Sequence, residues 1–355
     1  MCVTTQAFSH FKLQKEPHRA RLYRELPPIW WSDQAKRWFV TNPELVRQIQ
    51  TDTAFKVPDY DASPITERLG IDLTFTNRLR QYLPLAWEGA EHKRLRRLFS
   101  SVIAANQNAA IESFVEDLRR RLSHALASDR FCMVADVLRP ALRIANMRLA
   151  GFSTTDGEAL PDIESIPGMF DDRLSPTGRK RIEQNIRDLY SRLPDARDEE
   201  SKLVILAFTA LSANTLLGSL AESLLASFAE AGTQNFSAID YPAELPATGL
   251  PLIEKICITP CEIDGEKIAA GDRLRLFIEV EGLLASGKPE YSDLYFAAGP
   301  HRCPGQAYSR RIWKSLRDEL ATLDVFFEIG AIEHRKNDCV FNYIEKLELM
   351  VHDQE

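Results

Sequence analysis

Near its carboxyl end the chain reads Phe296-Ala-Ala-Gly299-Pro-His301-Arg-Cys303-Pro-Gly305, and a run with helical periodicity follows over residues 306–323. A cysteine at the start of a helix lies close to unpaired backbone N–H groups, whose positive field lowers the pKa of the thiol and favours the thiolate. A thiolate in this position is a metal ligand or a nucleophile. Glycines on both sides of the cysteine allow sharp bends and the close approach of a flat, bulky group.

Two more side chains of this segment suit a metal-bound thiolate. Phe296 would form an apolar wall that limits the access of water to the sulfur. His301, two residues before Cys303, offers an N–H donor that suits a carboxylate. The alternative is an ordinary buried cysteine beside a turn, which does not account for five residue types at fixed spacing before a helix.

These residues resemble the haem-binding loop of the cytochrome P450 family, whose pattern is Phe-x-x-Gly-x-His/Arg-x-Cys-x-Gly, and every specified position is filled. The resemblance implies the P450 fold, mainly α with small β-sheets, and a haem b cofactor. It implies that Cys303 is the thiolate ligand of the haem iron, a ligand that pushes electron density toward O–O cleavage. The other residues that it places around the cofactor are Phe296, Gly299, His301 and Gly305.

A basic run earlier in the chain resembles the family's haem-contacting helix. It covers residues 91–102, and His92 and Arg96 share one face because they are four residues apart. The resemblance implies that both bind haem propionates, while a solvated basic face is the alternative. Lys255 stands where the family commonly has a propionate-binding arginine, and it keeps the charge but loses the planar fork.

Composition limits the class of protein. The chain has 355 residues, of which 45% are hydrophobic and 27% charged, and it has no Pro/Gly/Ser-rich linker, so we expect a single domain over residues 1–355. The net charge of -7 does not invite nucleic acid. The six cysteines lack regular spacing, and residues 1–16 hold no apolar leader, so we expect reduced thiols and a cytoplasmic location without a membrane anchor.

Periodicity predicts helices with one sheet-forming segment at each end of the chain. We expect a strand, turn and strand over residues 29–41, a helix that begins at Pro43 with Asn42 as its cap, and strands within residues 251–280 with a hairpin turn at Asp264-Gly265. Further amphipathic helices are expected over residues 111–127, 134–149 and 178–193. Residues 57–85 are irregular, and by the resemblance they cover the substrate pocket.

Residues 203–221 carry no charge over a length that could span a bilayer. Six polar side chains interrupt this stretch, so a long helix through the middle of the fold is the preferred interpretation. Aligning Leu224-Leu225-Ala226 with the end of the family's oxygen-binding helix puts Ser212-Ala-Asn214-Thr215 at its small-x-acid-alcohol site. The resemblance therefore names Thr215 and Asn214 as the catalytic residues.

The amide of Asn214 stands where the family has an acid, and an amide orients water but cannot supply a titrating proton. Proton delivery then runs through Thr215, waters and a substrate group, or the enzyme uses peroxide or performs chemistry without dioxygen cleavage. A third interpretation is that both residues are packed polar groups, because Ser and Thr often bond back to helix carbonyls.

The family's Glu-x-x-Arg motif is missing. The candidate position reads Glu244-Leu-Pro-Ala247, and its prolines argue against a helix. Residues 281–295 are also too few for the family's usual meander before the cysteine loop. We therefore expect a member trimmed on the cysteine side, in which something else holds this loop, and a second copy of the chain in a homodimer is a candidate.

The function that the resemblance implies is a haem-thiolate monooxygenase acting on a small or medium organic substrate, in a biosynthetic pathway. Electrons would come from a separate ferredoxin or flavoprotein, since no flavin or nicotinamide fingerprint is present. A docking patch for an acidic donor, or a plain solvated face, would comprise Arg97, Arg302, Arg310, Arg311 and Lys314. The alternatives are a peroxide-using or non-oxygenating haem enzyme and a non-catalytic haem scaffold.

Overall fold

Helices make up most of the computed structural model, which describes residues 26–58, 70–152, 163–170, 174–193, 198–231, 234–278, 289–334 and 344–352. The α-helices are α3 (Pro43–Thr51), α5 (Thr74–Gln81), α6 (Gly89–Ala125), α7 (Arg139–Leu149), α8 (Pro176–Arg192), α9 (Glu199–Glu230) and α11 (Gln306–Leu320). Six short 3-10 or π turns join them: η1 (Pro84–Ala86), η2 (Met133–Leu138), η3 (Ile163–Phe170), η4 (Phe236–Ala238), η5 (Pro289–Phe296) and η6 (Gly299–His301). The prediction of a mainly α fold is confirmed.

Within the described residues the strands form three small sheets. Five strands in the order β1-β2-β8-β5-β3 make the largest: β1 (Ile29–Ser32), β2 (Arg37–Val40), β8 (Arg273–Phe277), β5 (Leu252–Cys257) and β3 (Phe55–Lys56). The second sheet, in the order β4-β10-β9, joins β4 (Arg130–Cys132), β10 (Ile344–His352) and β9 (Phe326–His334). The third is the hairpin of β6 (Cys261–Ile263) and β7 (Glu266–Ile268), which turns at Asp264-Gly265 as predicted.

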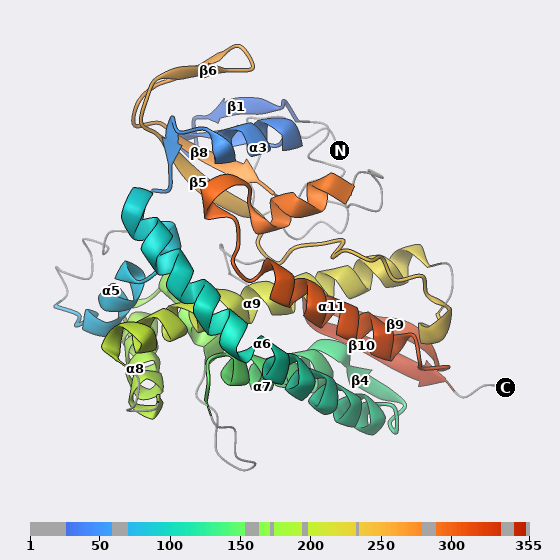
Figure 1. The fold of residues 1–355 in the computed structure, drawn as a ribbon. Coiled ribbons are helices and arrows are strands. Elements are labelled where there is room, and N and C mark those ends of the chain that lie inside the picture. The colour runs from blue at the N-terminus through green and yellow to red at the C-terminus, as the bar shows by residue number, and fades with distance from the viewer. Residues whose placement is uncertain are drawn as a thin grey trace.

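The amino-terminal and carboxyl-terminal parts of the chain meet in the five-stranded sheet, because β2 pairs in parallel with β8. Helix α3 packs beside this sheet, and its cap is the predicted one, since the Asn42 side chain accepts from the N–H of Leu45 at 3.0 Å. Figure 1 shows the orange segment before α11 lying between this sheet and the helices α6 and α11. This segment carries the cysteine.

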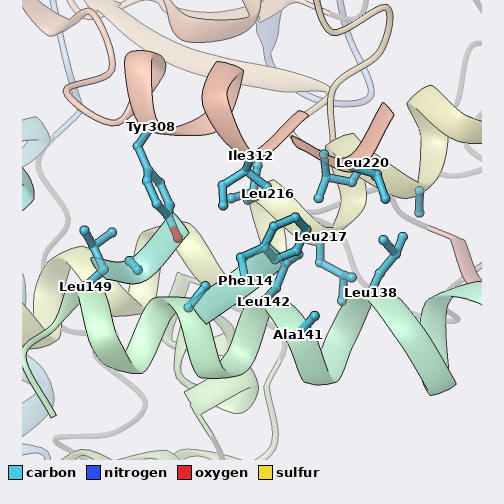
Figure 2. Packing of buried hydrophobic residues seen from close by; sticks show 14 of the residues in the cluster. Phe114, Leu138, Ala141, Leu142, Leu149, Leu216, Leu217, Leu220, Tyr308 and Ile312 are labelled. Atoms are coloured by element: carbon cyan, nitrogen blue, oxygen red, sulfur yellow. The ribbon is translucent and has the colours of Figure 1, made fainter. Parts of the chain in front are cut away.

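The main core lies where four helices meet. Phe114 of α6, Leu142 of α7 and Leu216 of α9 are buried in one apolar cluster, which Tyr308 and Ile312 of α11 close from the other side. Figure 2 shows these side chains pointing toward one another. Because the helix after the cysteine is anchored in this core, the carboxyl end of the cysteine loop has a fixed position.

Two helices differ from the prediction. The expected helices over residues 91–102 and 111–127 are one helix, α6, because the polar residues between them include no Pro or Gly that would break it. The central helix α9 is also longer than its uncharged part. Among the described residues, α9 alone is long and apolar enough to cross a membrane, but 87% of its most apolar window is buried inside the fold.

Candidate functional site

The cysteine loop is held by backbone contacts to its own ends and to α3. The N–H of Cys303 donates to the carbonyl of Phe296 at 2.6 Å, which closes the loop. The N–H of Ala298 donates to the buried side chain of Gln50. Gly299 has a φ of +69°, and a Cβ there would lie 3.0 Å from the carbonyl oxygen of Gln50, so only glycine fits. The loop therefore rests directly on the carboxyl end of α3.

Gly305 has a different role from Gly299. Its φ of -84° suits any residue, but a Cβ there would lie 3.6 Å from the sulfur of Cys303 and 3.8 Å from the ring of Phe208 in α9. The missing side chain leaves open the space beside the sulfur. Phe296 is buried, as expected for the wall of such a site.

The surroundings of the Cys303 sulfur fit an internal site. The side chain is exposed by its accessible surface, yet desolvation by the surrounding protein raises the pKa of its thiol. The residue thus keeps some accessible surface although many protein atoms surround its sulfur. The N–H groups of Gly305 and Gln306 and the charge of Arg96 lower the pKa, as expected at a helix start, but burial outweighs them. The net direction is thus opposite to the one expected from the helix terminus alone.

The two predicted basic-helix residues lie against the cysteine loop. His92 is buried, and its ring nitrogens lie 2.9 Å from the carbonyl oxygens of Pro84 and Pro300. Arg96 donates to the carbonyl of Arg302, next to the cysteine. His92 is therefore not part of a solvated basic face, whereas Arg96 is half-buried and contacts the loop backbone.

Glu88, directly before α6, contacts His301 of the cysteine loop and lies near Lys255 of β5. The Nε2 atom of His301 lies 2.9 Å from a carboxylate oxygen of Glu88, and its ring packs edge-on against His92 with centroids 4.3 Å apart. Desolvation lowers the pKa of His301, although the hydrogen bond with Glu88 opposes this. Lys255 is 4% exposed, and its pKa is lowered by burial against the attraction of Glu88.

The two predicted catalytic residues, Thr215 and Asn214, lie on α9. Phe208 brings this helix to the cysteine loop, and Thr215 is seven residues further on the same face, about 10 Å along the axis. Asn214 is buried on a different face, where its Nδ2 donates to the carbonyl of Glu164 at 3.0 Å. Its Oδ1 is buried without a hydrogen-bond partner among the described residues.

Residues 240–251 form no helix, as the prolines predicted, but Glu244 is nevertheless paired. Its carboxylate lies 2.7 Å from Nε of Arg310 in α11. Arg310 also contacts Asp293, so its guanidinium is part of a partly exposed ion-pair network. Of the predicted patch, Arg97, Arg302, Arg311 and Lys314 are exposed, and Arg302 is paired with Asp293. Residues 281–288 of the predicted short meander and the amino-terminal residues 1–16 lie outside the described residues.

At the level of sequence, no family model and no curated protein matches the chain. The fold, in contrast, matches solved cytochrome P450 structures. P450BioI, in a complex with an acyl carrier protein that carries hexadec-9Z-enoic acid, is 16% identical with a TM-score of 0.76, covering 96% of this chain and all of that one. The chain has the cytochrome P450 fold.

Two other solved structures have the same fold. CalO2 is 15% identical with a TM-score of 0.77 over 98% of this chain and 99% of its own. CYP109E1 from Bacillus megaterium, in complex with testosterone, is 11% identical with a TM-score of 0.73 over 96% of this chain and 99% of its own. The P450 fold is thus kept over almost the whole length, although few residues are shared.

The residues present fit a haem in this P450 fold. The sulfur of Cys303 lies beside Gly305, and one group nearby lacks a partner that a cofactor carboxylate would supply. Nδ1 of His301 is buried without a hydrogen-bond partner among the described residues, and Lys255 is a buried cation. Burying an unpaired polar atom and a positive charge costs free energy, so an anion at this position is favoured.

Sequence reasoning missed four residues of the site. Glu88 and Gln50 hold His301 and the loop backbone, and Asp293 and Phe208 contact the segment on either side of the cysteine. The buried Gln50 follows from no pattern in α3. Of the four, only Glu88 could have been noticed, because it directly precedes a predicted helix. Its position would have suggested a helix cap and not a partner for His301.

Proposed function

We propose that this protein is a haem-thiolate monooxygenase that inserts one oxygen atom from O2 into a small or medium organic substrate. The observation that carries the proposal is the sulfur of Cys303 before α11, which interacts with two backbone N–H groups and with the charge of Arg96. The P450 fold supports it. A single domain, a cytoplasmic location and a place in biosynthesis are parts of the same proposal.

The side chains of the site would divide the binding of haem b among them. Cys303 would ligate the iron, and a coordinated thiol is deprotonated even where burial raises its pKa. Arg96, Lys255 and His301 would face the propionates. His92, whose two ring nitrogens lie at backbone carbonyls, would support the loop beside them, and Phe296 and the missing side chain at Gly305 would shape the wall beside the sulfur. The bound haem supplies the oxidation chemistry, and the protein supplies ligand, pocket and protons.

Thr215 and Asn214 would handle protons on the α9 side. A hydroxyl both donates and accepts, so Thr215 can pass a proton to or from water in the pocket. Asn214 lies on a different face of α9, where its Nδ2 donates to the carbonyl of Glu164 and its buried Oδ1 would accept a hydrogen bond from a separate buried water. Neither side chain titrates at neutral pH, so the proton itself would come from solvent or from the substrate.

The electron donor would be a separate ferredoxin or flavoprotein. Exposed cations beside the cysteine loop attract an acidic partner, and Arg97, Arg311 and Lys314 are exposed there. Lys314 is paired with Asp318, so Arg97 and Arg311 are the stronger candidates.

One observation favours a second function within the same fold. Asn214 is packed against η3 and offers no acid, so a peroxide-using or non-oxygenating haem-thiolate enzyme would also suit this helix. Turnover with peroxide but none with a ferredoxin and its reductase would favour this function over monooxygenation.

The first test is spectroscopic. The purified protein is expected to contain haem, and its ferrous carbon monoxide complex is expected to show the absorption band of thiolate ligation. Cys303→Ala should abolish that band, while Cys261→Ala, which removes a thiol far along the chain, should keep it. The same band in the Cys303 variant, or a colourless protein that cannot be reconstituted with haem, would contradict the proposal.

A further inference from the structure

A proline-rich strap takes the place of a helix between α9 and the sheet. The strap, residues 240–251, is bound to α9 on one side, where Ser219 accepts from the N–H of Gly249 at 2.9 Å and Ser223 accepts from the N–H of Ala247 at 3.3 Å. On the other side it is bound to the segment that carries the cysteine, by Trp313, Arg317 and Tyr295, whose side chains donate to the carbonyls of Pro242 and Pro246. The strap therefore has a fixed position between the two sides of the site.

Arg310 connects this strap to the cysteine loop. Its Nε lies 2.7 Å from Oε2 of Glu244 in the strap, and both atoms are buried. The two atoms are not aligned as a hydrogen bond, so the contact is an ion pair. Its Nη2 donates to Asp293 at 3.2 Å, and the guanidinium lies 5.8 Å from the centre of the Phe296 ring. One planar cation thus contacts two carboxylates and the wall of the site.

Asp293 extends the network to both sides of the cysteine. Its Oδ1 accepts from Arg302 at 3.2 Å and from Gln306 at 3.0 Å, in addition to Arg310. Arg302 directly precedes Cys303, and Gln306 begins α11 and also accepts from Arg302 at 2.7 Å. A displacement of Asp293 would therefore move the backbone before and after the sulfur together.

We infer that Glu244, Arg310 and Asp293 are positioning residues that hold Cys303 in the geometry for ligating a metal. This inference rests on the proposed function, and it assigns the role of the missing Glu-x-x-Arg pair to residues from the strap, η5 and α11. It also removes the need for a second subunit to hold the loop. The three side chains do not touch the sulfur, so their effect acts through Arg302, Gln306 and Phe296.

The test measures thiolate ligation by absorption spectroscopy and does not depend on enzyme activity. Holoprotein variants Arg310→Lys, Asp293→Asn and Glu244→Gln are reduced under carbon monoxide, and the loss of the thiolate band is followed over time. Arg310→Lys keeps the charge but loses the planar fork, so we expect the band to be lost at least threefold faster than in the unaltered protein. Asp293→Asn should do the same, and Glu244→Gln should have a smaller effect in the same direction. Arg311→Lys is the matched control, since the neighbouring Arg311 donates to the surface side chain of Asn108 and to no loop residue among those described, and its rate should not change.

The outcomes separate the two proposals. If the unaltered protein shows no thiolate band, the proposed function fails and the inference fails with it. If the unaltered protein shows the band and the three variants lose it no faster than Arg311→Lys, the positioning role is overturned while the function stands. Should Asp293→Asn fail to fold by circular dichroism, Glu244→Gln decides, because it changes one partly exposed charge without changing size.

Discussion

The two sides of the site are held by different forces. On the cysteine side, charged groups from distant parts of the chain meet: His301 is 213 residues from Glu88, and Asp293 joins Arg302 to Arg310. On the α9 side the contacts are between hydroxyls and backbone, and they are buried. Thr209 and Ser219 donate to carbonyls four residues before them, and Ser219 also accepts from the strap.

This difference decides how each side responds to change. Partly exposed ion pairs contribute little each, weaken with salt and tolerate displacements of a few tenths of an ångström. Close backbone packing does not tolerate added volume, because the interior has no room into which it could expand. The cysteine side should therefore be sensitive to charge and pH, and the α9 side to the size of side chains.

The largest expected effect tests the packing of the α9 side. A Cβ at Gly249 would lie 2.6 Å from the carbonyl oxygen of Thr215 and 2.9 Å from Cα of Gly218, both backbone atoms that cannot turn aside. Gly249→Ala should lower the free energy of unfolding by about 3 kcal/mol, at the upper end of overpacking costs. Ser219→Ala, which removes the hydrogen bond from Gly249 and the bond to the carbonyl of Thr215 without adding volume, should cost about 1 kcal/mol. Denaturant unfolding measures both, and equal losses would show that close approach is not what fixes the strap.

The next effect sharpens the chemical role of the same helix. Thr215→Ala should lower the product formed per electron consumed by about tenfold, which is modest for the loss of a positioned proton donor. Thr215→Ser should restore most of the product, since it restores the hydroxyl. Thr209→Ala is the control, because its buried hydroxyl bonds its own helix at Ile205. Unchanged coupling in the Thr215 variant would place the proton path elsewhere.

The same contrast explains what sequence alone could predict. Contacts within one helix or one loop follow from local rules, so the cap at Asn42, the turn at Asp264-Gly265 and the helix after Cys303 were all predicted. The pairing of Glu244 with Arg310 could not be, because it joins segments 66 residues apart through a strap without periodicity. Long-range charge pairs leave no pattern in the sequence when each partner comes from a different loop.

The burial of a side chain is equally hard to predict from the sequence. The helix terminus beside Cys303 is visible in the sequence, but the surrounding protein that raises the pKa of its thiol is not. The destination of the Asn214 amide was equally hidden, because the carbonyl of Glu164 is 50 residues away in η3. The sequence was therefore a better guide to which residues lie near one another than to their pKa shifts and hydrogen-bond partners.

The smallest expected effect tests the charge sensitivity of the cysteine side. Burial lowers the pKa of His301 below its ordinary value of 6.5, so the unfolded chain takes up a proton before the folded protein does. The free energy of unfolding of the protein prepared without cofactor should therefore fall as the pH drops below about 6.5, and become level again below the pKa of the folded state. His301→Gln should show a flatter decline over this range, whereas His352→Gln, which alters an exposed side chain, should follow the unaltered protein. If the free energy of unfolding of the His301 variant falls as steeply with pH as that of the unaltered protein, burial in the loop does not shift the pKa of His301. The cysteine side would then not be the more pH-sensitive of the two sides.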